Sequence, residues 1–95
     1  MSTVIEKQLG LALARRLAVF KESIANGTLL EDEMQLQAVV YMISEILLPC
    51  CCMLTNKAKI QALLENVPLL QGQPELVQKL VLLVYADLAR CNGLG

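Results

Sequence analysis

The sequence predicts an all-α fold of four antiparallel helices, arranged as a compact bundle or as two stacked helical hairpins, in a single domain over residues 1–95. Hydrophobic residues make up 56% of the chain and are almost wholly aliphatic, with one Phe, two Tyr and no Trp. Leu, Ala and Met favour helices, and β-branched residues nowhere form the alternating runs that strands require. Short connections between the apolar segments place successive helices antiparallel.

The first helix is expected to run from about Thr3 to Ala25. Ser2 or Thr3 is suited to its N-cap, and Asn26-Gly27 should end it because both residues tolerate the left-handed conformation. One apolar stripe is expected at steps of three and four residues, formed by Ile5, Leu9, Leu13, Leu17, Phe20 and Ile24 and widened on a second side by Leu11, Ala14 and Ala18.

The second helix is expected to open between Thr28 and Glu31, with acidic residues in its first turn, where they suit the positive end of the helix dipole. Pro49 should break or bend it near Leu48. One face is expected to consist of Met34, Ala38, Tyr41, Met42, Glu45 and Leu48, and the other faces of Val39, Val40, Ile43, Ile46 and Leu47. A helix that is apolar nearly all round is expected to be buried on several sides.

The third helix is expected over Lys57–Asn66, with Thr55 or Asn56 as its cap and Pro68 as its stop. Its apolar residues are Ala58, Ile60, Leu63, Leu64 and Val67. A connecting loop over 69–73 should follow.

The fourth helix is expected to begin with Pro74 at its first position and to run to about Arg90. The unbroken apolar run 80–86 covers every face of this helix. Its final part resembles the first helix of a tetratricopeptide-type hairpin, although the second helix of such a hairpin is missing; the residues concerned are Leu82, Tyr85, Ala86, Ala89 and Gly93. The resemblance covers about a fifth of the chain and implies a small helical chaperone.

Four cysteines, Cys50, Cys51, Cys52 and Cys91, supply the number of thiols that a tetrahedral zinc site uses. Three consecutive helical residues point about 100° apart, so they do not converge on one ion. The sequence also has no C-x-x-C motif and no His. We therefore expect the cysteines to act as small buried hydrophobes, not as metal ligands; reversible palmitoylation and redox use are the alternatives.

Three other function classes have little support. Without His, the commonest general acid or base near neutral pH is missing and a Cys nucleophile lacks its usual activator, so we expect neither enzyme activity nor a cofactor. The formal net charge is −1 and the eight basic residues are scattered, which argues against nucleic acid. A membrane span over 34–56 would place Glu45 near the bilayer centre at a cost of about 2.5–3.5 kcal/mol, so a cytoplasmic location is expected.

Charged residues make up only 18% of the chain, below the usual share of about 25%. A chain of this size cannot bury so much apolar helix unaided, so something else should cover part of it. We expect a non-enzymatic protein–protein interaction module, acting as a small chaperone, adaptor or inhibitor, that binds a partner's amphipathic helix. The alternatives are a self-associating structural homodimer and a membrane-surface protein anchored through Met34–Leu54.

The residues expected to bind the partner lie off the best core stripes of the second and fourth helices. They are Val40, Ile43, Leu47, Val81 and Val84. Substitution of Val40 or Val84 by Asp is expected to abolish association and to leave helicity largely intact.

Overall fold

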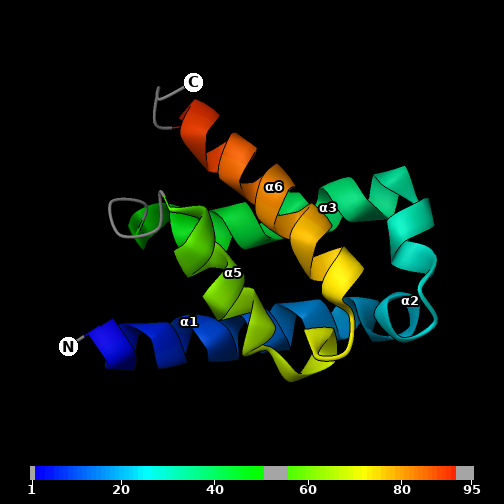
Figure 1. Ribbon diagram of the computed structural model, residues 1–95, viewed down its shortest axis with the longest axis horizontal. Helices are drawn as coiled ribbons and strands as arrows, with labels where there is room; N and C mark the ends of the chain where they lie inside the picture. The colour runs from blue at the N-terminus through cyan, green and yellow to red at the C-terminus, as the bar shows by residue number, and fades with distance from the viewer. Residues whose placement is uncertain (1, 51–55, 92–95) are drawn as a thin grey trace.

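The computed structural model describes the backbone of residues 2–50 and 56–91 and the side chains of residues 7–49 and 56–90. Within these ranges every regular element is helical and no strand is present. The four main helices are α1 (Ser2–Leu17), α3 (Glu33–Leu47), α5 (Lys57–Glu65) and α6 (Pro74–Cys91) (Figure 1). The expected all-α class with four main helices is therefore confirmed.

The first half of the chain contains one tighter turn in each helix that the sequence predicts. The 3-10 turn η1 (Ala18–Phe20) separates α1 from the short α2 (Lys21–Ala25), and η2 (Thr28–Glu31) precedes α3. Gly27 ends α2 with a φ of 78°, in the left-handed region that glycine adopts without strain. Helix α3 begins later than expected, because Asp32 is its N-cap and accepts a hydrogen bond from the Gln35 backbone N–H at 3.1 Å.

In the second half of the chain the helices start and end close to the residues that the sequence predicts. The 3-10 turn η3 (Leu48–Cys50) contains Pro49 and ends the second helix where it should. Asn56 caps α5, since its Oδ1 accepts a hydrogen bond from the Ala58 backbone N–H at 2.8 Å. Another 3-10 turn, η4 (Pro68–Leu70), leads into the connection, and Pro74 is the first residue of α6.

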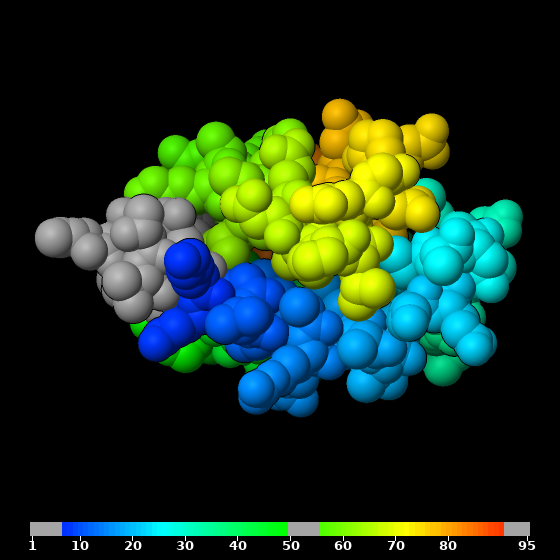
Figure 2. All heavy atoms as spheres, turned by 90° about the horizontal axis from the view of Figure 1, so that it is seen from below, coloured from blue at the N-terminus to red at the C-terminus, as the bar shows by residue number. Residues whose placement is uncertain are grey.

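The helices form two pairs, α1 with α3 and α5 with α6, and the two pairs cross each other. Helices α1 and α3 run in opposite directions, and α6 crosses in front of α3 at a steep angle (Figure 1). Helix α6 packs on both α5 and α3, and α1 packs on both α3 and α5. From the α1 side, α1 lies between α5 with η4 on one side and α3 on the other (Figure 2). The arrangement agrees better with stacked hairpins than with a bundle of aligned axes.

One hydrophobic core joins all four helices. From α1 and α2 it takes the expected stripe: Leu13, Leu17 and Ile24 are buried, and Leu9 and Phe20 are partly buried. The Ile5 side chain is outside the described residues. Of the three residues expected to widen the stripe, Ala14 is partly buried against the core. Leu11 and Ala18 are exposed, so the expectation is wrong for these two. From the third helix and its end the core takes Ile60, Leu63, Leu64 and Val67.

Candidate functional site

The five residues expected to bind a partner belong to the hydrophobic core instead. Val40, Ile43, Leu47, Val81 and Val84 have exposed fractions of 9%, 0%, 0%, 5% and 0%. The prediction that they lie off the core stripes is therefore wrong, because neighbouring helices cover the Val- and Ile-rich side of α3 and the matching side of α6. Asp at Val40 or Val84 would bury a charge among apolar side chains, so we now expect such variants to unfold.

The side of α3 opposite the core presents a second line of residues to solvent. We call this line the outer stripe; it consists of Met34, Ala38, Tyr41 and Glu45 of α3 and of Leu48, the first residue of η3. The steps between its members alternate between four and three residues. At 100° per residue, all five therefore point within about 80° of one another. Met34 is 84% exposed, Tyr41 66% and Leu48 38%, so the outer stripe is a largely apolar line on the protein surface.

Helix α3 thus carries two apolar stripes, either of which could face the core by periodicity alone. The one that is buried consists of Leu36, Val39, Val40, Ile43, Ser44 and Leu47. The outer stripe contains Glu45, whose charge would be costly to bury, whereas the buried stripe contains no ionisable residue. The position of Glu45 is the sequence signal that identifies the exposed side. Sequence reasoning grouped Met34, Tyr41 and Leu48 on one face but assigned partner binding to the other faces.

An ion pair links the outer stripe to α1. Arg16 Nη2 lies 3.9 Å from Glu45 Oε1, and both side chains are more than half exposed. Such an exposed pair contributes little to stability and opens easily. Val19 follows Arg16 by three residues, which places it on the same side of this segment, and it is 82% exposed. Val19 is thus a further exposed apolar residue on the segment that carries Arg16.

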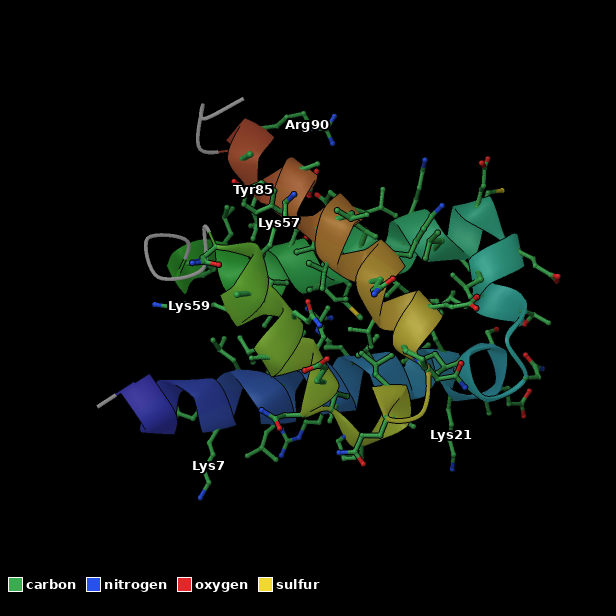
Figure 3. The ribbon with its side chains drawn as sticks, in the orientation of Figure 1. Lys7, Lys21, Lys57, Lys59, Tyr85 and Arg90 are labelled. Carbon is green, nitrogen blue, oxygen red and sulfur yellow. The ribbon has the colours of Figure 1, made fainter. Side chains whose placement is uncertain are left out.

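Helix α6 carries a second, shorter apolar patch. We call it the α6 patch; it consists of Leu82, Leu83 and Ala86, all exposed. Lys79 lies one turn before this patch and Arg90 one turn after it. Arg90 extends from the last turn of α6 (Figure 3) and its Nη2 donates to Asp87 Oδ1 at 3.0 Å. The patch occupies about one helical turn, so it offers much less length than the outer stripe.

A cation–π contact joins the first residue of α5 to the C-terminal half of α6. Lys57 Nζ lies 5.3 Å from the centre of the Tyr85 ring, and the two side chains point toward each other in Figure 3. Contacts of this kind contribute about 0.5–1 kcal/mol at exposed sites. This pair therefore serves the packing of the two helices.

No family model, curated protein or solved structure matches this chain. The resemblance of the last helix to a tetratricopeptide-type hairpin accordingly gains no support from a family model, and Gly93 lies outside the described residues. The fold and the surface of this chain must therefore supply the functional argument by themselves.

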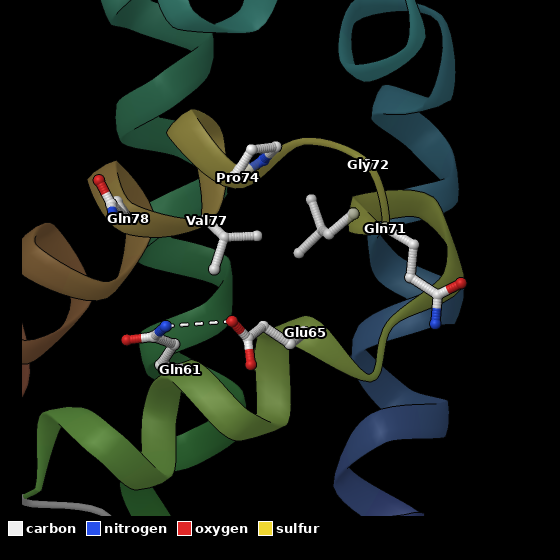
Figure 4. Close-up of a pocket in the computed structure, with 8 residues that line it drawn as sticks. Gln61, Glu65, Gln71, Gly72, Pro74, Val77 and Gln78 are labelled. Atoms are coloured by element: carbon white, nitrogen blue, oxygen red, sulfur yellow. Dashed lines mark hydrogen bonds between the residues drawn. The ribbon is translucent and has the colours of Figure 1, made fainter.

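A shallow pocket lies where α5, the connection after η4 and the start of α6 meet (Figure 4). Its volume is about 270 Å³, and Leu70 and Val77 are its buried apolar walls. Gln61 Nε2 donates to Glu65 Oε2 at 3.0 Å along α5, on one side of the pocket. Glu65 is the one ionisable residue among those that line it. The pocket thus brings together no nucleophile and base, and its amide-rich rim suits only weak polar contacts.

Three features remain, a metal site, the cysteines and a membrane span, and the described residues support neither the first nor the last. Within the described ranges no cluster of three or more His, Cys, Asp or Glu side chains is placed to hold a metal ion. Cys51 and Cys52 lie outside those ranges, as do the side chains of Cys50 and Cys91, so the expectation that the cysteines are buried stays a prediction. Among the helices described, none combines the length and the apolarity needed to cross a bilayer.

Proposed function

We propose that this chain is a non-enzymatic protein–protein interaction module that binds an amphipathic helix of a partner along the outer stripe of α3. The observation that supports this most is the alignment of three large exposed apolar side chains, Met34, Tyr41 and Leu48, on one helix face. These three residues recur every seven positions, and with Ala38 and Glu45 between them the steps alternate between four and three residues. This is the spacing with which one helix packs its side chains against another. Monomeric proteins rarely leave a large apolar surface uncovered.

The dimensions and the residue types of the outer stripe suit a helix as its ligand. From Met34 to Leu48 the stripe extends about 21 Å along the axis, which corresponds to four turns of a bound helix. Tyr41, at its centre, provides a rigid aromatic anchor, a residue type enriched where binding energy concentrates. Met34 adapts its shape to the partner, and Ala38 allows a close approach of the two backbones. Chaperone, adaptor and inhibitor are all roles that such a surface would serve.

The membrane-surface alternative is less well supported by the same helix. Peripheral helices use Lys and Arg to attract anionic lipid headgroups. No Lys or Arg occurs between Lys21 and Lys57, a segment that includes all of α3. An anionic bilayer would repel Glu33 and Glu45, so we favour a protein partner.

Selection from a displayed library of helical peptides on the purified chain tests the proposal. We expect the selected peptides to share apolar residues at steps of three and four. Their binding should be lost with the double variant Met34→Ser/Tyr41→Ser. The matched control is Leu82→Ser/Leu83→Ser, which removes apolar side chains from the α6 patch and should leave binding unchanged.

Two results would contradict this function. One is a failure of the library to yield any helix whose binding depends on Met34 and Tyr41. The other is a concentration-dependent homodimer in sedimentation experiments that Met34→Ser/Tyr41→Ser dissociates, because the stripe would then be a subunit interface. Far-UV circular dichroism of each variant verifies that the fold is kept.

A further inference from the structure

The distribution of charge around the outer stripe is strongly one-sided. Between Lys21 and Lys57 the chain contains five carboxylates and no basic residue; the five are Glu22, Glu31, Asp32, Glu33 and Glu45. Three of them lie together at the N-terminal end of α3 and are exposed. At neutral pH this end of the docking surface is therefore negative, and a partner that neutralises it is favoured.

The basic residues lie mostly elsewhere on the molecule. Lys7 and Lys21 point away from α3 on the far side of α1 and α2, while Lys57 and Lys59 project from α5 (Figure 3). Arg16 is the exception, since it borders the outer stripe and approaches Glu45 at 3.9 Å. Because both members of that pair are more than half exposed, a cation on a partner can replace Arg16 at little cost.

We propose that the partner helix is basic: it packs apolar residues on the outer stripe and places Lys or Arg opposite Glu45 and beside the acidic end at 31–33. This inference rests on the proposed function and names the chemistry of the ligand for the same surface. Charge complementarity selects the partner and speeds its approach, while burial of apolar side chains supplies most of the affinity.

Glu45 has a particular role in this interaction, because it is the charged member of an otherwise apolar line. A single polar or charged residue in a helix–helix seam fixes the register, since one alignment only places a complementary group opposite it. A basic side chain opposite Glu45 therefore sets where along the outer stripe the partner begins and ends. Its neutral replacement should relax that alignment as well as weaken binding.

A second copy of this chain is a poorer occupant of the same surface. If two outer stripes faced each other, the acidic residues of both copies would share one interface, and α3 itself carries no Lys or Arg. Arg16 at the border of each stripe would offset Glu45 and leave the acidic end at 31–33 without a counter-charge on α3. Like charges brought together in an interface oppose association. The α6 patch of another copy has Lys79 and Arg90 beside it, but Glu75 and Asp87 on the same helix offset them.

The experiment uses two fluorescent three-heptad peptides with Leu at the a and d positions, one with Lys and one with Glu at the e and g positions. Their affinities for the full chain are measured by fluorescence anisotropy. We expect the Lys peptide to bind about tenfold more tightly than the Glu peptide, and this preference to shrink when NaCl rises from about 50 mM to about 500 mM.

The variant Glu31→Gln/Glu33→Gln/Glu45→Gln, which keeps the capping Asp32, should lose about tenfold in affinity for the Lys peptide. Arg16→Gln should bind the Lys peptide about twofold more tightly, because Glu45 loses its competing partner.

The outcomes separate this inference from the function on which it rests. Equal affinities for both peptides, abolished by Met34→Ser/Tyr41→Ser, would overturn the basic partner and keep the docking surface. Binding of the Lys peptide that survives Met34→Ser/Tyr41→Ser would overturn both. Self-association through the outer stripe, seen as a concentration-dependent mass that Tyr41→Ser reduces, would make a second copy the occupant and overturn the basic partner.

Discussion

Ile43→Ala and Tyr41→Ala change residues only two positions apart on α3, yet we expect very different effects on stability. Ile43 is fully buried and Tyr41 is 66% exposed. Truncation of a core Ile to Ala costs about 2–5 kcal/mol, because its contacts are lost and a cavity remains. For Ile43 we expect about 3 kcal/mol, a large part of the roughly 5–15 kcal/mol that stabilises a small domain. Truncation of an exposed Tyr on a helix should change stability by less than about 0.5 kcal/mol, since Ala also improves helix propensity.

Urea titrations followed by far-UV circular dichroism measure both free energies of unfolding. The two variants should differ by at least about 2 kcal/mol, and thermal melts should place Ile43→Ala more than about 10 °C below the wild type. A loss for Tyr41→Ala as large as that for Ile43→Ala would mean that α3 is rotated about its axis. The outer stripe would then lie in the core, and the docking surface on α3 would not exist.

Three further predictions test local features of the fold. The Ser44 hydroxyl is buried and has no hydrogen-bond partner among the described residues, so Ser44→Ala should stabilise the chain by about 1 kcal/mol in the same titration; a loss of stability would mean that the hydroxyl has a partner. Asp32→Ala removes the side-chain cap of α3 at the Gln35 N–H and should cost about 1 kcal/mol, without a change in the urea m-value. Gly27→Ala should cost about 1 kcal/mol because the residue has a φ of 78°. Gly10→Ala, inside α1 and with open space where the added Cβ would lie, should stabilise the chain by about 0.5–1 kcal/mol; equal effects at the two glycines would contradict this reasoning.

The ends of the helices could be predicted because single residues determine them locally. Gly27 adopts the left-handed conformation that the sequence implies, Asn56 caps α5 through its side chain, and Pro74 occupies the first position of α6. Each of these signals depends on the chemistry of one residue and its nearest neighbours along the chain. The start of α3 was misplaced for a related reason. Thr28 and Asp32 are both good caps, and nothing local indicated that Thr28 would begin a 3-10 turn.

The rotation of α3 about its axis could not be predicted in the same way. Met34, Tyr41 and Leu48 form as regular an apolar stripe as Val39 and Ile43 do with their neighbours, so periodicity favours neither side. The local signal that separates the two sides is Glu45, whose charge is costly to bury. Which helices cover the other side depends on where α1 and α6 lie, and that information comes from distant parts of the chain. For α6 the run 80–86 raises the same difficulty, and it resolves with Leu80, Val81 and Val84 inside and the α6 patch outside. The five predicted binding residues lie in the core because an apolar residue off one stripe of a helix can face a second neighbouring helix.

Several large apolar side chains are exposed among the described residues, and their placement decides what they mean. Isolated exposed hydrophobic residues such as Leu11 are normal on protein surfaces and need no function. Leu82 and Leu83 are adjacent in sequence, so they cover a wide sector of α6 but little of its length. Within the part of the chain whose side chains the structure describes, exposed apolar side chains recur over four turns along one line only from Met34 to Leu48, which is the shape that another helix can cover. Amount of apolar surface alone would not distinguish these cases, and for that reason the rotation of α3 is the feature on which a binding role depends.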